Sequence, residues 1–438
     1  MSHAADVPQP NNGFYVLVTG ANSGLGLGIG TRLIDEFLTT RPQTEALVLI
    51  VTTRDQRKGD ATIHHLEQHL RKVCQKHERT LPGIATLLQQ RVHFRQERLD
   101  LLSLTSVQKL SKRLQDTTPK LDVVICNAGI GGWTGINWPV AIFSILTTWR
   151  RALTYPTFKL SGIGWTAKPQ ILTSEEASEP PLGEVFCANV FGHYLLGHNL
   201  APLLARHTRS EDMRGRIIWV SSLEAYDFAF DLNDIQGLKS KVPYESSKRL
   251  TDIMAITSTL PSTADQVDQY LASSDQSEET MKPKIYVSHP GICGTSIIPL
   301  PLILEYLMLA AFYLARFLGS PWHSVTVEKG AVAMVWLALA KQSTLDAMEE
   351  KEGAGKWGSG TDFWGQERVE RTEVAGWGWG GRMGEYKRKG RNPYAQDVTK
   401  ESAEKFRKTG EKCWAEMERL RVEWEDRLQA AGVAFETD

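Results

Sequence analysis

The chain has 438 residues and a mass of 49.0 kDa, with 42% hydrophobic residues, 23% charged residues and a formal net charge of −1. This composition indicates a globular protein with a large core, and the balanced charge gives no support for a nucleic-acid partner. Its five cysteines are scattered without a C-x-x-C pair, so we expect no disulfide framework, no metal and a reducing, cytosol-facing compartment. Residues 1–12 are polar, lack a secretory signal and are expected to form a disordered tail.

The first predicted element is a buried strand over Phe14–Val18, followed by a glycine-rich turn at Thr19–Gly26 and a helix. Gly20 permits the tight turn, Gly24 lets backbone N–H groups approach a pyrophosphate, and Gly26 allows the helix to pack on the strand. Because a helix N-terminus attracts anions, this turn is predicted to bind the phosphates of a dinucleotide. A purely structural turn is the alternative.

A second buried strand, Ala46–Val51, ends in two threonines and an arginine. In dinucleotide-binding folds the residue at this point meets the adenosine ribose. Arg54 with Thr53 favours the extra phosphate of NADP, since a guanidinium pairs well with phosphate. Two alternatives stay open: Asp55 accepts from the ribose of NAD, or Arg54 is a solvated loop residue.

Helical periodicity follows between Lys58 and Gln90, where His65 and His69 stand four residues apart. They lack the H-E-x-x-H pattern, so a solvated helix face is favoured over a metal site. A third strand begins at Val92 and leads to Asp100, which is expected at the carboxyl edge of the sheet. One reading of Asp100 is a cap for the helix predicted from Ser103 to Leu114.

The fourth strand, Leu121–Cys126, leaves through Asn127-Ala128-Gly129, whose small residues would let the backbone lie against a cofactor. Asn127 can also hydrogen-bond across to the neighbouring strand. The segment Ile130–Pro181 has four tryptophans and low regularity, and we expect it to be an insertion that packs over apolar surface on the substrate or membrane side. A long helix is predicted over Glu184–Leu204, with the poor helix former Asn189 in its middle.

A fifth strand from Gly215 delivers two serines, Ser221 and Ser222, to the carboxyl edge, and Tyr244 and Lys248 follow one helical turn apart. Ketone reduction needs a proton at the developing alkoxide, and a free phenol is a sluggish acid or base near neutrality. A fixed ammonium one turn away favours the phenolate and is expected to lower the tyrosine pKa. Tyr244 is therefore the predicted proton donor, with Ser222 orienting the carbonyl oxygen.

Beyond the strand Ile285–His289 lies an almost wholly apolar segment, Leu302–Leu318, whose charges Glu305 and Arg316 fall on nearly one face. It is marginal for a span of the ~30 Å hydrocarbon core, so an interfacial or re-entrant membrane helix is favoured. A helix buried under the insertion or in a dimer contact is the alternative. Residues 346–438 form a Trp/Gly-rich extension ending in a charged helix, expected to dock on the catalytic domain or on a partner.

The order of glycine turn, Asn-Ala-Gly, Ser-Ser and Tyr-x-x-x-Lys resembles the short-chain dehydrogenase/reductase family. The resemblance implies an α/β fold, a Rossmann-type doubly wound parallel sheet in three α/β/α layers, over residues 13–345, with a lid or membrane segment at 297–319. It assigns catalysis to Ser222, Tyr244, Lys248 and Asn189, and cofactor binding to Gly20, Asn22, Ser23, Gly24, Leu25, Gly26, Thr53, Arg54, Asp100, Asn127, Tyr244, Lys248, Pro290, Gly291 and Thr295.

Several of these roles come from the family alone. Its members use the second serine of a Ser-Ser pair, an aspartate matching Asp100 contacts the adenine, and a P-G-x-x-x-T segment, here Pro290 to Thr295, meets the nicotinamide. The asparagine matching Asn189 distorts its helix and holds a water in a proton relay; a satisfied interior side chain is the alternative for Asn189.

Within the family, the chain is similar to the fungal reductases of 3-keto sterols, through Arg32–Leu38, the long insertion and the tail. This implies NADPH-dependent reduction of the C-3 ketone left after C-4 demethylation, at the endoplasmic reticulum or lipid droplets beside other demethylation enzymes. Gly28 and Gly30 depart from the pattern and weaken the first helix. Reduction of another lipophilic ketone, retinoid-like or polyketide-derived, and a non-enzymatic scaffold are the alternatives.

Overall fold

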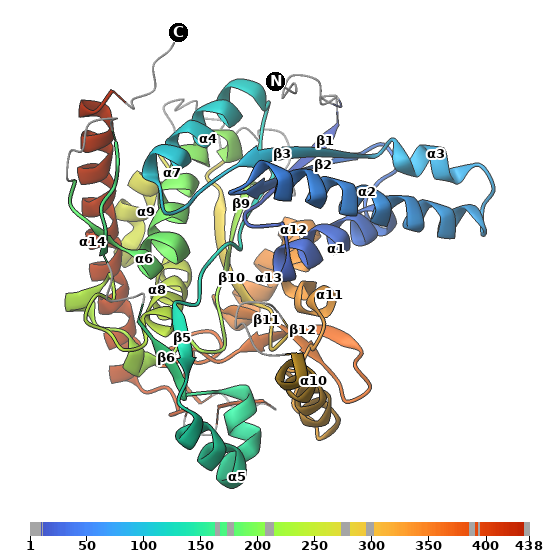
Figure 1. Ribbon diagram of the computed structural model, residues 1–438. Coiled ribbons are helices and arrows are strands. Elements are labelled where there is room, and N and C mark those ends of the chain that lie inside the picture. Colours follow the sequence, from blue (N-terminus) through green and yellow to red (C-terminus); the bar gives the residue numbers. More distant parts are fainter. Residues whose placement is uncertain are drawn as a thin grey trace.

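The computed structural model describes residues 10, 12–162, 167–172, 179–205, 214–272, 281–294, 302–384, 390–392 and 395–432 (Figure 1). An eight-stranded sheet in the order β12-β11-β10-β9-β4-β1-β2-β3 forms its centre. Neighbouring strands are parallel, except that β12 runs antiparallel to β11. The strands are β1 Gly13–Val18, β2 Ala46–Thr53, β3 Val92–Arg98, β4 Val123–Cys126, β9 Arg216–Val220, β10 Lys284–His289, β11 Lys356–Thr361 and β12 Glu367–Thr372.

Helices cover both faces of this sheet, as Figure 1 shows, and two hydrophobic cores fill the spaces between the layers. The central strands are continuous apolar runs because both of their faces are buried. One face carries α1 Gly24–Thr40, α2 Gln56–Glu78, α11 Val327–Gly330, α12 Val332–Leu339 and α13 Gln342–Glu352; the other carries α4 Leu104–Thr117, α6 Glu184–Phe186, α7 Gly192–Ala205, α8 Pro243–Thr257, α9 Ala264–Tyr270 and α14 Lys400–Ala430. The predicted three-layer α/β/α fold is confirmed.

The segment predicted as irregular, Ile130–Pro181, is more ordered than expected in its described part. It forms the strands β5 (Trp133–Ile136) and β6 (Lys159–Ser161), which pair as a small antiparallel sheet, and between them the helix α5 (Trp138–Thr154). The prolines and tryptophans suggested irregular structure, but Pro139 stands in the first turn of α5, where a proline is tolerated because its missing N–H would have no partner in the helix. Two further short strands, β7 (Ala167–Lys168) and β8 (Leu182–Gly183), pair with each other.

Three other element boundaries differ from the sequence-based expectation. The periodic stretch after Lys58 is two helices, α2 and α3 (Ile84–Gln89), separated by Gly83 in the left-handed region. The helix predicted over Glu184–Leu204 is interrupted by a π-helical turn at Cys187–Phe191. No strand is predicted beyond residue 345, because the charged and glycine-rich sequences there lack the usual strand alternation. In the structure, β11 and β12 nevertheless extend the central sheet in this region.

The glycines of α1 serve close packing rather than weakening its docking. A Cβ on Gly28 would lie 2.8 Å from the backbone of Val327 in α11, and one on Gly30 would lie 3.0 Å from the Leu66 side chain of α2. Without side chains, these two positions let the neighbouring helices approach. The helix itself remains continuous over Gly24–Thr40.

The apolar segment of the sequence forms α10 (Leu302–Phe317), which contacts α5 at the lower edge of the molecule in Figure 1. Within the described ranges, no helix has both the length and the apolar character needed to cross a bilayer. The C-terminal helix α14 packs on α8 and α9 of its own chain, which settles its docking partner in favour of the catalytic domain.

Candidate active site

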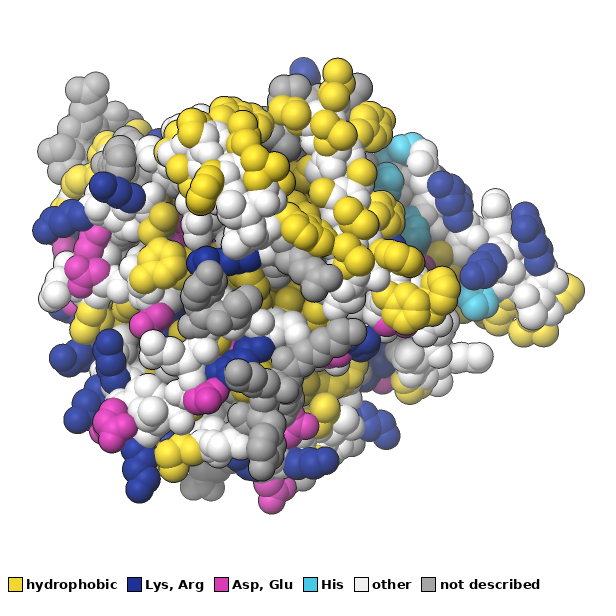
Figure 2. All heavy atoms as spheres, turned by 90° about the horizontal axis from the view of Figure 1, so that it is seen from below, with side chains coloured by type: hydrophobic (Ala, Val, Ile, Leu, Met, Phe, Trp, Pro, Cys, Tyr) yellow, Lys and Arg dark blue, Asp and Glu magenta, His cyan; other side chains and the backbone are white. Residues whose placement is uncertain are grey.

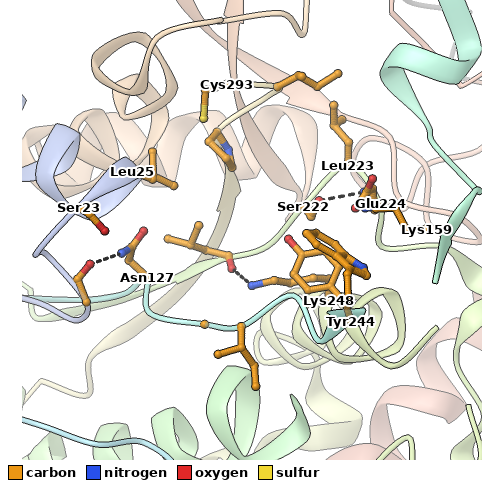
Figure 3. Close-up of a pocket in the computed structure, with 18 of the residues that line it drawn as sticks. Ser23, Leu25, Asn127, Lys159, Ser222, Leu223, Glu224, Tyr244, Lys248 and Cys293 are labelled. Atoms are coloured by element: carbon orange, nitrogen blue, oxygen red, sulfur yellow. Dashed lines mark hydrogen bonds and ion pairs between the residues drawn. The ribbon is translucent and has the colours of Figure 1, made fainter. Parts of the chain in front are cut away.

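A cavity of about 830 Å³ opens at the carboxyl ends of the central strands, where open α/β sheets bind their ligands. In Figure 3, Ser23, Leu25 and Asn127 stand at one end of it, and Ser222, Tyr244 and Lys248 at the other. Every predicted site residue within the described ranges lines this cavity, with the exception of Asn189. Thr295 lies outside the described residues.

The glycine turn has the geometry that phosphate binding requires. Gly20 and Gly24 have φ of 66° and 53°, a region that favours glycine, and a Cβ on Gly26 would lie 2.3 Å from the Gly20 carbonyl oxygen. The N-cap residue of α1, Ser23, makes no side-chain capping bond. The first N–H groups of α1 are therefore left for an anion in the cavity.

The exit of β4 is tied to this turn by a polar cluster. Asn127 Nδ2 donates to the carbonyl oxygens of Thr19 at 2.9 Å and Gly20 at 3.3 Å, which confirms the predicted cross-strand bond. Thr19 Oγ1 accepts from the backbone N–H groups of Asn127 and Ala128. The fully buried His193 bonds the same hydroxyl, and burial lowers the pKa of His193 to about 3, so this imidazole is neutral.

Two basic side chains line the cavity beside the end of β2, Arg54 directly after that strand and Lys58 in the first turn of α2. Asp55 is instead the N-cap of α2 and accepts from the Lys58 backbone N–H at 3.0 Å. Asp55 does not line the cavity, so the contact that the structure shows for it is with its own helix, and the reading as a ribose ligand is not supported. Lys58 was not predicted, because the helical periodicity that follows it does not show that this lysine faces the cavity.

Asp100 does not cap the helix that follows it. The N-cap of α4 is Ser103, whose side chain accepts from the Ser106 N–H. Asp100 Oδ1 accepts from the Leu102 N–H at 3.1 Å, and the residue lines the cavity near Arg54. The capping alternative is therefore wrong, and the adenine contact implied by the family stays a prediction.

Ser222, Tyr244 and Lys248 are brought together as predicted (Figure 3). The Ser222 side chain interacts with the Tyr244 phenol, and Lys248 Nζ lies 5.6 Å from the Tyr244 ring centroid. Lys248 Nζ donates to the Val220 carbonyl oxygen at 2.8 Å, which fixes the ammonium at the end of β9. Burial and the nearby Lys356 lower the pKa of Lys248 to about 8.

The expected lowering of the Tyr244 pKa is not what the structure shows. Burial, followed by the Glu224 carboxylate, raises the pKa of Tyr244 above its ordinary value, and the interaction with Ser222 only partly offsets this rise. Burial outweighs the other effects because a phenolate loses most of its hydration there. The phenol is therefore protonated near neutrality, which suits a proton donor.

Asn189 lies in the π-helical turn, and its side chain bonds the backbone of Ile130 instead of lining the cavity. Its Oδ1 accepts from the Ile130 N–H at 2.8 Å, and its Nδ2 donates to the Ile130 carbonyl and to Ser247 Oγ. A Cβ on Gly129 would come within 2.8 Å of Asn189 Oδ1, so the glycine makes this contact possible. The helix distortion expected from the family is present; a catalytic role of Asn189 stays a prediction.

A buried polar cluster beside Tyr244 was not predicted from the sequence. Lys159 of β6 forms a hydrogen-bonded ion pair with Glu224, and its Nζ lies 3.8 Å from the Trp133 ring centroid. The Trp133 ring contacts the Tyr244 ring edge-on at a centroid distance of 4.8 Å. These partners are far apart in the sequence, so no local spacing could have revealed them.

A second missed contact comes from the C-terminal extension. Lys356 Nζ of β11 donates to the Ser222 carbonyl oxygen at 2.6 Å and to Asp252 Oδ2 at 2.7 Å. Asp252 lies one turn after Lys248 in α8, so Lys356 connects the segment that carries Ser222 with the helix that carries Lys248. The residues after 345 thus support the site directly.

Loop geometry also shapes the last wall of the cavity. Gly291 has φ of 68°, and a Cβ there would lie 2.4 Å from the Trp322 carbonyl oxygen, so glycine is required. Pro290 and Gly291 both line the cavity. In the part of the chain that the structure describes, no three His, Cys, Asp or Glu side chains gather as metal ligands, and His69 contacts Asp35 of α1.

The doubly wound sheet, glycine turn and Ser-Tyr-Lys grouping define a short-chain dehydrogenase/reductase. The chain is 47% identical to the 3-keto-steroid reductase erg27 of Aspergillus fumigatus, with 95% of each chain covered. It is 38% identical to the 3-keto-steroid reductase ERG27 of Gibberella zeae, with 94% of each covered. The chain belongs to this family of 3-keto-steroid reductases.

Other comparisons are more distant. The 3-keto-steroid reductase erg27 of Schizosaccharomyces pombe is 32% identical over 82% of this chain and 90% of its own. No protein-family model matches the chain. Among solved structures, a 7α-hydroxysteroid dehydrogenase complexed with NADH and 7-oxo glycochenodeoxycholic acid aligns with a TM-score of 0.40 at 15% identity, covering 78% of this chain and 92% of that one.

Proposed function

We propose that the protein is an NADPH-dependent reductase of the C-3 ketone of a 4-demethylated sterol, forming the 3-hydroxy sterol in ergosterol synthesis. The observation that carries this proposal is the grouping of Ser222, Tyr244 and Lys248 in a cavity whose remaining walls are largely apolar. The names of the family members, 3-keto-steroid reductases, support the same substrate class.

The residues present fit a dinucleotide phosphate. The uncapped N-terminus of α1 and the glycine turn would hold the pyrophosphate, while Arg54 and Lys58 would hold the 2′-phosphate. Lys248 would hold the nicotinamide ribose. When bound, NADPH supplies the hydride to the ketone carbon.

The chain's own groups handle the ketone oxygen. Ser222 Oγ donates a hydrogen bond to this oxygen and orients the carbonyl, and Tyr244 delivers the proton as negative charge develops. The raised pKa keeps the Tyr244 phenol protonated until that moment. The Lys248 ammonium then stabilises the phenolate that remains.

The other half of the cavity suits a rigid apolar body. Helices α5 and α10 supply its walls, and a cavity of about 830 Å³ is within the range for ligands of this size. The apolar lining residues from this half are Ile136, Trp138, Ala141, Ile145, Leu304, Leu307, Met308, Ala311 and Phe312. These side chains offer apolar contact area, and only the indole N–H of Trp138 among them can donate a hydrogen bond, which matches a sterol ring system.

The substrate assignment is tested with purified full-length protein, NADPH and a detergent-dispersed 4-desmethyl 3-keto sterol. We expect NADPH oxidation coupled to formation of the 3-hydroxy sterol, identified by mass spectrometry. Turnover only with a retinoid-like or polyketide-derived ketone would replace the sterol assignment with the second candidate. No turnover with any ketone would favour the scaffold.

The cofactor preference predicts a selective effect of Arg54→Ala. The KM for NADPH should rise about 10- to 100-fold, because one charge-assisted hydrogen bond to the 2′-phosphate is lost. The KM for NADH should change little, because NADH lacks this phosphate. Lys58→Ala should act in the same direction, and Arg98→Ala, an exposed arginine at the end of the next strand, serves as the control. Equal increases for NADPH and NADH would show that Arg54 does not read the 2′-phosphate.

We also propose that the protein works at the cytosolic face of the endoplasmic reticulum or on lipid droplets, near the other C-4 demethylation enzymes. The proposed substrate supports this, because a 4-demethylated 3-keto sterol is made by those enzymes and partitions into membranes. Fractionation of cells that express the tagged full chain tests the location. Recovery in the soluble fraction alone would overturn it.

A further inference from the structure

Two helices far apart in the sequence form one apolar surface beside the cavity. Helices α5 and α10 contact each other, and Figure 2 shows hydrophobic side chains gathered over this lower face of the molecule. We call these exposed side chains the portal surface: Trp138, Val140, Ile142, Phe143, Ile145 and Leu146 from α5, and Ile303, Tyr306, Leu307, Tyr313, Leu314 and Phe317 from α10.

The portal surface is too apolar for an ordinary solvent-facing surface. Leu146 is 80% exposed, Ile303 74% and Phe143 68%. The two helices together contain four charged residues, Arg150, Arg151, Glu305 and Arg316. Contiguous exposed apolar area of this kind marks an interaction site.

The same helices form the wall of the cavity. Trp138, Ile145 and Leu307 belong both to the portal surface and to the cavity lining. The apolar exterior is therefore continuous with the apolar half of the cavity. A lipophilic ligand could pass from one to the other without entering water.

We propose that the portal surface seats the protein on a lipid bilayer, and that the sterol enters the cavity between α5 and α10 directly from the membrane. This inference rests on the proposed function for its substrate. The aromatic and aliphatic side chains of the portal surface, with few charges among them, are typical of helices that lie at a membrane interface. A second copy of the chain on this face would cover the route into the cavity, so a bilayer is the occupant that leaves the enzyme usable.

The seating is tested by flotation of the full chain with phosphatidylcholine vesicles, with and without phosphatidylserine. Phe143→Glu with Leu146→Glu changes α5, and Ile303→Glu with Phe317→Glu changes α10; none of these four residues lines the cavity. Each pair should reduce the vesicle-bound fraction at least about 10-fold, because charge is placed where apolar contact is needed. Leu87→Glu is the matched control, 58% exposed on α3 at the far side of the molecule, and should float like wild type.

Entry from the membrane is tested by presenting the 3-keto sterol in two forms. Both pairs should keep kcat/KM within about 2-fold for sterol in detergent, and should lose at least about 10-fold for sterol embedded in vesicles. Wild type that stays with soluble protein, or variants that float normally, would overturn the seating. Variants that convert a dimer to a monomer without altered flotation would assign the surface to a second copy. Absence of sterol turnover in both forms with normal flotation would overturn the proposed function alone.

Discussion

Tyr244→Phe is expected to lower kcat for ketone reduction by roughly 10³-fold, the middle of the range for losing a general acid. The substitution removes only the phenolic hydroxyl, while the ring keeps its edge-on contact with Trp133. Steady-state rates of NADPH oxidation measure the loss. The affinity for NADPH, measured by fluorescence titration, should stay within about 3-fold, because the transition-state interaction alone is removed.

Tyr226→Phe is the matched control for this variant. Tyr226 is buried nearby, does not line the cavity, and its hydroxyl has no hydrogen-bond partner among the described residues. Removing that hydroxyl should leave kcat almost unchanged. A Tyr244→Phe enzyme that keeps a tenth or more of wild-type kcat would show that another group supplies the proton.

Trp414→Ala is expected to lower the free energy of unfolding by about 3–5 kcal/mol, the usual cost of truncating a buried tryptophan. Trp414 of α14 is fully buried against Tyr194 and Tyr270, and its Nε1 donates to the Met254 carbonyl oxygen of α8. The cavity left behind and the unpaired carbonyl both add to the cost. Denaturant titration followed by circular dichroism measures the change.

Because α14 packs on the helix that carries Tyr244 and Lys248, Trp414→Ala should also shorten the half-life of activity at elevated temperature. Val422→Ala, an exposed position on the same helix, is the control and should change the free energy of unfolding by less than about 0.5 kcal/mol. A Trp414→Ala protein with stability close to wild type would mean that α14 is dispensable for the catalytic domain.

Much of the candidate site could be predicted because its residues lie in short, contiguous sequence motifs. The glycines at 20, 24 and 26 set the turn through backbone geometry within one loop. Tyr244 and Lys248 are four residues apart, and residues at this spacing share one face of any helix, independently of the rest of the chain. Strands buried on both faces are likewise recognisable as apolar runs, so the sheet edge that gathers these motifs was predictable.

Other parts of the site depend on contacts between segments that are distant in sequence. Lys159 meets Glu224, and Lys356 meets Asp252 and the Ser222 carbonyl, only after the sheet has formed. The periodicity of hydrophobic residues along the chain gives no information about such long-range pairs. The irregular appearance of the insertion also hid α5, so the portal surface could be foreseen only in its α10 half.

The sequence by itself determined the class of fold, the order of the motifs and the identity of the candidate catalytic side chains, because local spacing is enough to place each group on its turn, strand or helix. The tertiary structure decided how those groups behave. It raised the Tyr244 pKa where neighbouring charge alone suggested a decrease, since burial acts on the phenolate from every side. It also placed α5 beside α10, joining two apolar helices into one surface at the mouth of the cavity.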